Sequence, residues 1–336
     1  MQVVLVSVCI PVYNMEGCIE RAIRSALNQT YPEIEILVCD NRSSDRTYEV
    51  ACSIKDRRLR VVKNEKNLGA YGNHNRCLKL AAGEWVKFLH GDDELFPSCV
   101  EEMTAVVRDR LSETALIGCG AIRLNERNQE IQKTFVPSDL FVMRAGMPSE
   151  FVLEGNIFGT PTMTMVHRHR LIRLGGFDLT MEPASDGDCW VLLRSHYPSV
   201  MMSRHLVWTR DDPPGSAGQQ LKLVNRFCHQ AFRQCEKWHR LDSTCSRLPL
   251  RKTFYGDWLI RETFRFWDAT IHALFFGRLV TGRMLGGELL RHRLFWTSIV
   301  FYLKNRLKGR TAVSFRDHSW PVALSSLRIK DLLGNS

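Results

Sequence analysis

Short apolar runs alternate with longer segments of helical periodicity over roughly the first 90 residues of the chain. Continuous apolar runs, without alternating polar positions, are typical of strands buried on both faces of a parallel sheet. We expect such strands at residues 3–12, 34–39, 59–62 and 85–89. Apolar residues that recur every three to four positions predict the intervening helices, at residues 16–28, 47–54 and 73–82. This order predicts right-handed crossovers and a mostly parallel sheet of the α/β class.

Polar residues follow the predicted strands directly. Tyr13, Asp40 and Asp92 each come at the carboxyl end of a strand. In parallel sheets these ends gather at one edge, where ligands bind beside the reversal of strand order, so we expect the three side chains to line one crevice. The chain has no G-x-G-x-x-G after the first strand and no G-x-x-x-x-G-K-S/T, which disfavours a dinucleotide fold and a P-loop.

The strand at 85–89 ends in Gly91 and two adjacent carboxylates, Asp92 and Asp93. Adjacent aspartates at the end of a buried strand repel each other and lose hydration, so they require positive charge nearby. A hard divalent cation that carries a diphosphate meets this requirement. The alternative is a turn or a helix N-cap, because aspartate is also favoured at those positions.

Composition and cysteine usage indicate a folded protein in a reducing compartment. The 336 residues suffice for two domains, and 44% hydrophobic with 24% charged residues is typical of globular chains. The 11 cysteines show neither a CxxC pair nor zinc spacing, which argues against a disulfide framework. The apolar N-terminus lacks a cationic lead and a cleavage site, so we interpret it as a core strand. No apolar stretch reaches the ~18–20 residues of a membrane-spanning helix.

Positive charge is concentrated at the C-terminal end. Residues 221–336 hold 21 Lys and Arg against 8 Asp and Glu, whereas residues 1–220 hold 25 against 28. The basic region shows amphipathic helical patterns with aromatic and leucine faces, which suit an anionic membrane surface. The alternative is a helical subdomain packed on the core with a solvated basic rim. Nucleic-acid binding is disfavoured, because no recognisable nucleic-acid motif is present and the aromatic residues follow helical faces.

A series of motifs in order resembles the inverting family 2 glycosyltransferases of GT-A fold. The motifs are SVCIPVYN, CDNRSSDRT, NLGAYGNHN, GEWVKFLHGDDEL, GGFD, SDGDCW and RDDPPGS. The resemblance covers roughly residues 4–218. It implies an α/β GT-A domain with a mostly parallel sheet at 1–218, which binds nucleotide sugar and acceptor, and a C-terminal helical region at 219–336.

The resemblance implies a donor site built from the first motifs. Three residues would pack around the uracil of a nucleotide sugar: Pro11, Val12 and Tyr13. Asp40 would hydrogen-bond the uracil edge, and Asn67 with Gly69 would lie near the base and ribose. The alternatives are a core-edge aromatic for Tyr13 and a turn-forming role for Asp40, although Asp45 is available to cap the next helix.

The resemblance also implies that Asp92 and Asp93 bind Mn²⁺ or Mg²⁺, which bridges the diphosphate. The family usually has an aspartate where this chain has His90. That histidine is open to three interpretations: a donor to a ribose hydroxyl, a group behind the metal ligands, or a strand-end residue. Arg210 occupies the slot of a basic residue that contacts the diphosphate from a loop, and a surface salt bridge is its alternative.

Transfer to a hydroxyl requires a positioned base. Asp186 matches the catalytic acidic segment of the family, and Asp188 is the second candidate; either could instead cap its helix. A single in-line displacement would invert the anomeric configuration. Acceptor specificity is expected between residues 116 and 170.

The sequence thus predicts a hexosyltransferase-like enzyme of the EC 2.4 class. It would use a nucleotide sugar, UDP-linked rather than GDP- or dTDP-linked, and a polysaccharide or undecaprenyl-diphosphate-linked glycan of bacterial surface assembly. We expect it in the cytoplasm, peripheral on the inner face of the membrane. Two rivals stay open: a non-catalytic nucleotide-sugar-binding or scaffold protein, and a nucleotidyltransferase. The latter is disfavoured because no Gly-rich, basic triphosphate loop follows the first strand.

Overall fold

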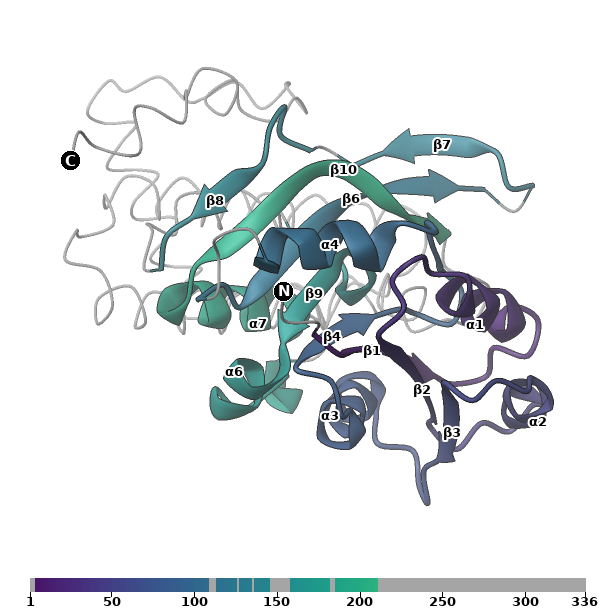
Figure 1. Ribbon diagram of the computed structural model, residues 1–336. Helices are drawn as coiled ribbons and strands as arrows, with labels where there is room; N and C mark the ends of the chain where they lie inside the picture. Colours follow the sequence, from purple (N-terminus) through teal and green to yellow (C-terminus); the bar gives the residue numbers. More distant parts are fainter. Residues whose placement is uncertain are drawn as a thin grey trace, which may run out of the picture. The chain divides into compact units, whose positions relative to one another are not determined.

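The computed structural model describes residues 4–108, 113–125, 127–134, 136–145, 158–181 and 185–210 (Figure 1). Within them ten strands form one sheet: β1 (Val6–Val12), β2 (Ile34–Asp40), β3 (Leu59–Lys63), β4 (Trp85–Phe88), β5 (Glu94–Leu95), β6 (Leu116–Leu124), β7 (Glu130–Lys133), β8 (Phe141–Met143), β9 (Thr164–His167) and β10 (Ser199–Arg210). The strand order is β3-β2-β1-β4-β9-β6-β10-β5, with β7 paired to β6 and β8 to β10. The predicted α/β class is confirmed.

The first half of the sheet is parallel, as predicted. β3, β2, β1 and β4 run in the same direction, and β1 is buried along its whole length. Three helices connect these strands: α1 (Ile19–Leu27), α2 (Thr47–Ser53) and α3 (Ala70–Leu80). α3 begins three residues before the predicted helix, because Gly69 adopts a φ of 77° that ends the preceding loop. Asp45 Oδ1 accepts a hydrogen bond from the backbone N–H of Thr47 at 3.0 Å, as expected for the start of α2.

The second half of the sheet is mixed. β9 runs antiparallel between β4 and β6, and β10 is parallel to β6 but antiparallel to β5 and β8. The strand expected at 117–122 is β6, and the one expected within 156–166 is β9. A chain that reverses direction needs no crossover helix, which is why the β-α alternation stops after β4.

Helices cover both faces of the sheet. On one face α1, α2 and α4 (Cys99–Arg108) pack with Val8 and Ile10 of β1. On the other face α3, α6 (Arg168–Arg173) and α7 (Ser185–His196) pack with Cys9. Because side chains alternate along a strand, one apolar run supplies both cores. Two short 3-10 helices, η1 (Pro161–Met163) and η2 (Leu179–Met181), connect the elements of the second half.

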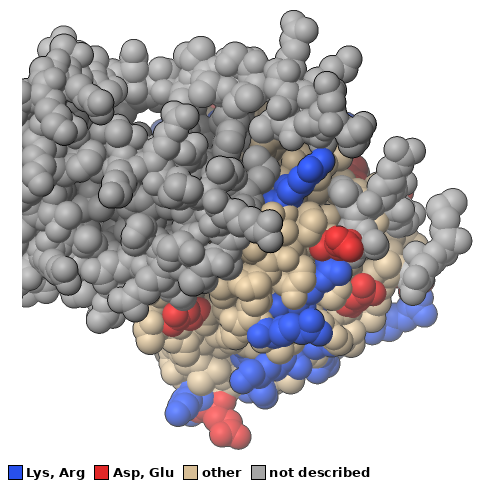
Figure 2. Space-filling model, turned by 90° about the vertical axis from the view of Figure 1, so that its left-hand side faces the viewer, with Lys and Arg blue, Asp and Glu red and all other residues tan. Residues whose placement is uncertain are grey.

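The expected boundary at 218/219 and the basic helical region 219–336 lie outside the described residues. Within the described ranges, no helix combines the length and apolar character needed to cross a bilayer. Figure 2 shows one face of the molecule, on which Lys and Arg gather along the lower part of the described surface with Asp and Glu among them. The described part of this face therefore presents mixed charge.

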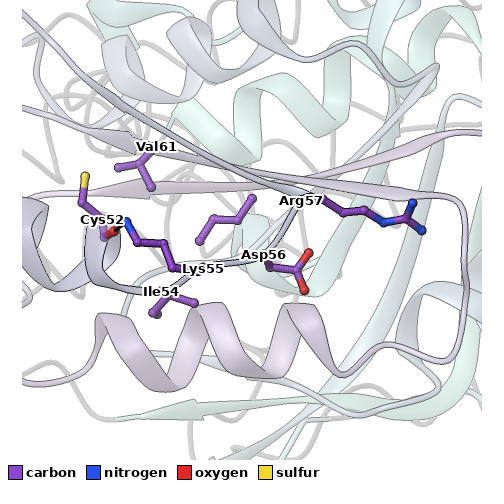
Figure 3. Close-up of a pocket in the computed structure, with 7 residues that line it drawn as sticks. Cys52, Ile54, Lys55, Asp56, Arg57 and Val61 are labelled. Atoms are coloured by element: carbon purple, nitrogen blue, oxygen red, sulfur yellow. Dashed lines mark hydrogen bonds between the residues drawn. The ribbon is translucent and has the colours of Figure 1, made fainter.

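A hollow of about 660 Å³ lies between the end of α2 and the start of β3 (Figure 3). It is lined by Cys52, Ile54, Lys55, Asp56, Arg57, Leu59 and Val61. Lys55 donates to the carbonyl of Cys52 at 2.8 Å and Asp56 pairs with Arg58 at 3.1 Å, so these polar groups are satisfied by neighbours. The hollow lies where the parallel strands begin, at the edge opposite Asp40, and it is separate from the candidate site described below.

Candidate active site

The carboxyl ends of β1, β2 and β4 lie next to one another, as the sequence pattern predicts. Val12 at the end of β1 pairs with Asp40 at the end of β2, and β4 pairs with β1 on its other side. The turn after β4 packs against β1, since a Cβ added at Gly91 would lie 3.0 Å from Val12 Cγ2. Three of the expected site residues thus leave adjacent strands at one edge: Tyr13, Asp40 and Asp92.

The carboxylate of Asp40 is fully buried at this edge. Its Oδ2 accepts the backbone N–H of Ser43 at 3.1 Å, so the turn-forming role considered from the sequence is present. Its Oδ1 is also buried and has no hydrogen-bond donor within the part of the chain that the structure describes. A buried acceptor without a donor costs about 1–3 kcal/mol, so this oxygen is suited to receive an N–H from a ligand.

The three expected base-packing residues of β1 and its turn differ in exposure. Pro11 and Val12 are buried, and Val12 belongs to the core of the first face of the sheet. Tyr13 is 44% exposed, so its ring is accessible to a bound molecule. The next residue, Asn14, has a φ of 53° and donates its N–H to Ser43 Oγ at 3.0 Å, which ties this turn to the one after β2.

The loop that carries Asn67 and Gly69 is held to β2 by Asn41, a residue that sequence reasoning missed. Asn41 Nδ2 donates to Asn67 Oδ1 at 2.9 Å and to the carbonyl of Gly69 at 3.1 Å. Its Oδ1 accepts the N–H of Leu68 at 2.9 Å and the amide of Asn64 at 3.1 Å. The concentration of asparagines just after the strand ends was the available signal. This network fixes the loop beside Asp40.

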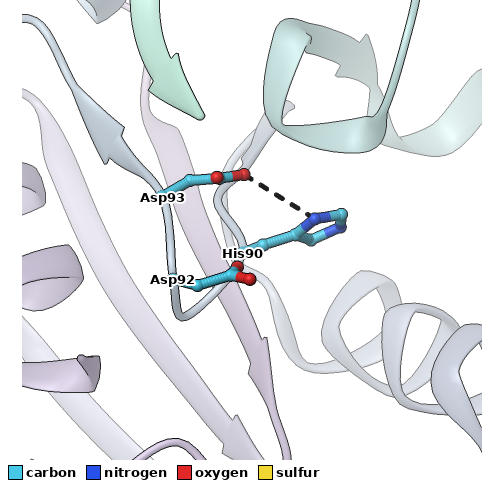
Figure 4. A group of neighbouring side chains, drawn as sticks. All are labelled: His90, Asp92 and Asp93. Carbon is cyan, nitrogen blue, oxygen red and sulfur yellow. Dashed lines mark ion pairs between the residues drawn. The ribbon is translucent and has the colours of Figure 1, made fainter. Parts of the chain in front are cut away.

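Asp92 and Asp93 form an acidic turn together with His90 (Figure 4). The three side chains project to the same side of the turn, and their potential ligand atoms all lie within 4.8 Å of one another. Asp93 is 5% exposed, and His90 Nδ1 lies 3.8 Å from its Oδ2. Burial, and then the neighbouring charge of Asp92, raise the pKa of Asp93 well above its ordinary value. The turn thus places a second carboxylate beside a buried one.

Two buried residues support the acidic turn from beneath. Thr162 in η1 accepts the backbone N–H of His90 at 3.0 Å and hydrogen-bonds the carboxylate of Asp93, which lowers the pKa of that carboxyl. Lys87 on β4 is fully buried, and its ammonium donates to the carbonyls of Phe88, at 3.0 Å, and of Thr162. Its charge also acts to lower the pKa of Asp93. Neither residue was predicted from the sequence as part of a site.

Arg210 reaches the acidic turn from the end of β10. Its backbone N–H donates to Asp93 Oδ1 at 3.3 Å, and its guanidinium donates to the carbonyl of Asp92 at 3.3 Å. The same guanidinium pairs with Glu94 at 2.7 Å and leaves only 14% of the side chain exposed. The ion pair considered as an alternative is thus present, and it holds Arg210 beside the two aspartates.

Asp186 lies in the first turn of α7, and Asp188 follows it. Asp186 Oδ1 accepts the N–H of Gly187 at 2.8 Å, and the carboxylate hydrogen-bonds the side chain of Tyr71 on α3. Burial raises the pKa of Asp186 to about 6, against the lowering effect of these hydrogen bonds. Asp188 is only 1% exposed, so it is less accessible to an acceptor than the partly buried Asp186.

A continuous series of contacts joins Asp186 to the acidic turn. The side chain of Tyr71 hydrogen-bonds Asp186, and the centroid of the Tyr71 ring lies 5.4 Å from the centroid of the His74 ring. His74 Nε2 lies 3.3 Å from His90 Nε2, and His90 faces Asp93. Tyr71 and His74 were not singled out from the sequence, although the motif NLGAYGNHN contains both. α3 thus brings together residues that are more than 90 positions apart in the chain.

Comparison with known proteins finds related sequences and structures. A family model described as Glycosyl transferase family 2 matches residues 7–174, half of the chain. The Escherichia coli protein WfaP, named as a UDP-Glc:alpha-D-GlcNAc-diphosphoundecaprenol beta-1,3-glucosyltransferase, is 44% identical over 89 residues. The match covers 26% of this chain and 36% of that relative, so the chain spans about a third of the relative's length.

Solved structures establish the fold. S. aureus TarS in complex with UDP-GlcNAc has a TM-score of 0.56 at 15% identity, covering 92% of this chain and 93% of that chain. Mannosyltransferase PcManGT from Pyrobaculum calidifontis, in complex with GDP-Man and Mn²⁺, has a TM-score of 0.53 at 17% identity, covering 92% and 88%. At such low identity the likeness supports the GT-A fold and says nothing further of the ligands.

Proposed function

Because the chain belongs to glycosyl transferase family 2, we propose that it transfers a sugar from a UDP-linked donor to a glycan hydroxyl with inversion of configuration. The acceptor class is a lipid-linked or polysaccharide glycan. One observation carries this proposal: the contacts from Asp186 through Tyr71, His74 and His90 to Asp93 link a carboxylate of raised pKa to a buried acidic turn. Glycosyl transfer needs a base and a site for the departing diphosphate, and these two groups are candidates for the two roles.

The donor base would lie at the ends of β1 and β2. The buried, unpartnered Oδ1 of Asp40 supports a ligand with an N–H at its edge, which uracil provides. The exposed ring of Tyr13 offers a stacking surface beside it. The names of the Escherichia coli relative and of the TarS complex include UDP-sugars, whereas the mannosyltransferase bound GDP-Man. Guanine and thymine also present an edge N–H, so the uridine preference rests on those two names.

The acidic turn fits a divalent cation. Asp93 is buried with a raised pKa beside a second carboxylate, and three potential ligand atoms converge. Asp92, Asp93 and His90 would hold the ion. When bound, a divalent cation supplies positive charge that stabilises the departing nucleoside diphosphate. Arg210, paired with Glu94, keeps a second positive charge beside the same turn.

Asp186 would act as the base. With a pKa of about 6 it is ionised at neutral pH and still accepts a proton readily. The acceptor oxygen forms a bond to the anomeric carbon, the bond to the donor phosphate oxygen breaks, and the acceptor proton moves to Asp186. One displacement from the opposite side inverts the anomeric centre. Tyr71 orients the carboxylate, and Asp188 is the reserve candidate.

The test is transfer by the purified full chain. UDP-, GDP- and dTDP-sugars are each offered with Mn²⁺ and a synthetic N-acetylglucosaminyl diphospholipid, and product linkage is read by NMR. We expect product only from a UDP-sugar, with the opposite anomeric configuration. Product with retained configuration would contradict the mechanism, and product only from a GDP- or dTDP-sugar would contradict the uridine preference.

The second candidate is a non-catalytic nucleotide-sugar-binding protein. The histidine at position 90, where the family usually has an aspartate, favours it. Binding of UDP-sugars without transfer to any acceptor or to water would support this candidate.

Membrane association through the basic residues 221–336, with a location on the inner face of the membrane, stays a proposal based on their charge. Sedimentation with anionic vesicles, compared with neutral ones, tests it.

A further inference from the structure

His90 lies beside the two aspartates in a geometry that matches a metal ligand. Its Nδ1 is 3.8 Å from Asp93 Oδ2, and the ligand atoms of His90, Asp92 and Asp93 are all within 4.8 Å of one another. Atoms bonded to a cation at about 2.1 Å are roughly 3.0 Å apart when adjacent and roughly 4.2 Å when opposite. The separation of Nδ1 and Oδ2 lies between these values and exceeds a hydrogen bond.

His74 stands behind His90 and determines which nitrogen carries its proton. His74 Nδ1 is 2.9 Å from the carbonyl oxygen of Ala70, and because a carbonyl only accepts, this nitrogen bears the hydrogen. The ring is 6% exposed and is surrounded by the rings of Tyr71, Phe88 and Phe177, with centroids 5.1 to 5.4 Å away. A charged ring is disfavoured in this apolar cage.

The neutral tautomer of His74 leaves its Nε2 as an acceptor. His90 Nε2 lies 3.3 Å from that atom, so the hydrogen between the two nitrogens belongs to His90. With the hydrogen on Nε2 directed at His74, Nδ1 of His90 is the nitrogen that faces Asp93. The ring is thus oriented with Nδ1 placed to bind a cation together with the aspartates. Histidine ligands in metal sites are typically oriented through the second ring nitrogen in this way.

We propose that His90 is a metal ligand through Nδ1, that His74 is the positioning residue that holds it in this tautomer, and that the site therefore selects Mn²⁺ or Co²⁺ over Mg²⁺. The identity of the metal as the transferase cofactor rests on the proposed function, but its binding does not. A nitrogen ligand suits transition metals, whereas Mg²⁺ prefers an all-oxygen shell. A carboxylate at position 90 would lack this selectivity.

Pulsed electron paramagnetic resonance of Mn²⁺ bound to the full chain tests the proposal, with the metal alone as probe. We expect a ¹⁴N coupling from one imidazole in the wild-type protein and none in His90→Gln. His90→Asp restores an all-oxygen site, so the ratio of Mn²⁺ to Mg²⁺ affinity should fall towards one. Mn²⁺ bound to the wild type without ¹⁴N coupling, or an unchanged affinity ratio in His90→Asp, would overturn the proposal.

The role of His74 requires its own variants. His74→Phe fills the aromatic cage but removes the acceptor for His90, and we expect a 10- to 100-fold loss of Mn²⁺ affinity, the range typical of groups behind metal ligands. His74→Gln offers a carbonyl acceptor to His90 and should recover part of the lost Mn²⁺ affinity. Equal affinity in His74→Phe and wild type would refute the positioning role.

A matched control separates this effect from general damage to a buried histidine. His167 is also largely buried, at the end of β9, where it faces Glu84 at 3.5 Å and packs on Trp85. His167→Gln should leave the ¹⁴N signal and the affinity ratio unchanged, and a change would refute the assignment. The outcomes also separate the two proposals: nitrogen coupling without sugar transfer contradicts only the proposed function, and transfer with an all-oxygen metal contradicts only the role of His90.

Discussion

The two halves of the sheet differ in how directly their sequence reveals their role. In the parallel half, from β1 to β4, the polar residues follow the strand ends, and their convergence could be inferred from strand order alone. In the mixed half, from β6 to β10, the strands reverse direction and the functional residues come from a 3-10 helix, a helix start and a strand end. Residues of an antiparallel region meet through packing, so local pattern alone does not reveal their neighbours.

The largest expected effect is at the contact between the halves. Asp186→Asn removes the proposed base, and we expect turnover to fall by roughly 10²- to 10⁴-fold with UDP-sugar binding unchanged. The raised pKa means that the folded chain holds this proton more tightly than the unfolded chain, so stability falls as pH rises from about 4 to about 6. Asparagine does not ionise, so Asp186→Asn does not lose this stability as pH rises. The melting temperature of the variant at pH 8 should therefore not be below that of the wild type. Full turnover would exclude Asp186 as the base.

In the parallel half, Asp40→Asn tests the base site. The substitution keeps the shape but presents an amide whose orientation cannot serve both Ser43 and a ligand N–H as two carboxylate oxygens do. We expect UDP affinity by calorimetry to fall by about 10-fold or more, in line with a loss of roughly 1.5–3 kcal/mol. Asp56→Asn is the matched control, because this aspartate pairs with Arg58 at the opposite edge of the sheet, and it should leave UDP affinity unchanged. Unchanged UDP binding in Asp40→Asn would exclude this aspartate from the base site.

In the mixed half, Gly118→Ala tests packing. A Cβ on β6 at this position would lie 2.5 Å from Phe158 and 2.8 Å from Met201 Sδ, and overpacking of this kind costs roughly 1–3 kcal/mol. Gly17→Ala is the control in the parallel half, since a Cβ there meets nothing within 4 Å. Thermal unfolding should show a fall of several degrees for Gly118→Ala and little change for Gly17→Ala. Equal melting temperatures for the two variants would mean that β6, Phe158 and Met201 accommodate the added methyl group without cost.

The smallest expected effect is a shift in pH dependence. Activity should rise with pH through about 6, because the base must be ionised to accept a proton. The hydrogen bond from Tyr71 lowers the pKa of Asp186, so in Tyr71→Phe the acidic limb should move to higher pH. The pH profile of kcat/KM, recorded for the wild type and for Tyr71→Phe, measures the position of the acidic limb in each. A limb that stays in place would show that Tyr71 does not act on Asp186.

Prediction from the sequence reached the parallel strands and the edge where Asp40, Asp92 and Asp93 lie, and their assignment to a donor site stays a prediction. Thr162 and Lys87, which contact the acidic turn, were missed because an η1 threonine and a strand lysine carry no local signal. Arg210 was expected at the diphosphate, and its ion pair with Glu94 became evident only in the structure. Each missed contact joins segments that are distant in the chain.

The sequence by itself determined the first seven elements of the fold and the edge of the sheet where polar residues gather. Periodicity and strand ends are local properties of a chain, and the parallel arrangement follows from them. Only the tertiary structure decided that Tyr71 and His74 of α3 link Asp186 to the acidic turn, and that His90 faces Asp93 through Nδ1. Tautomers and pKa values depend on burial and on the neighbours across a core, and these exist only once the chain has folded.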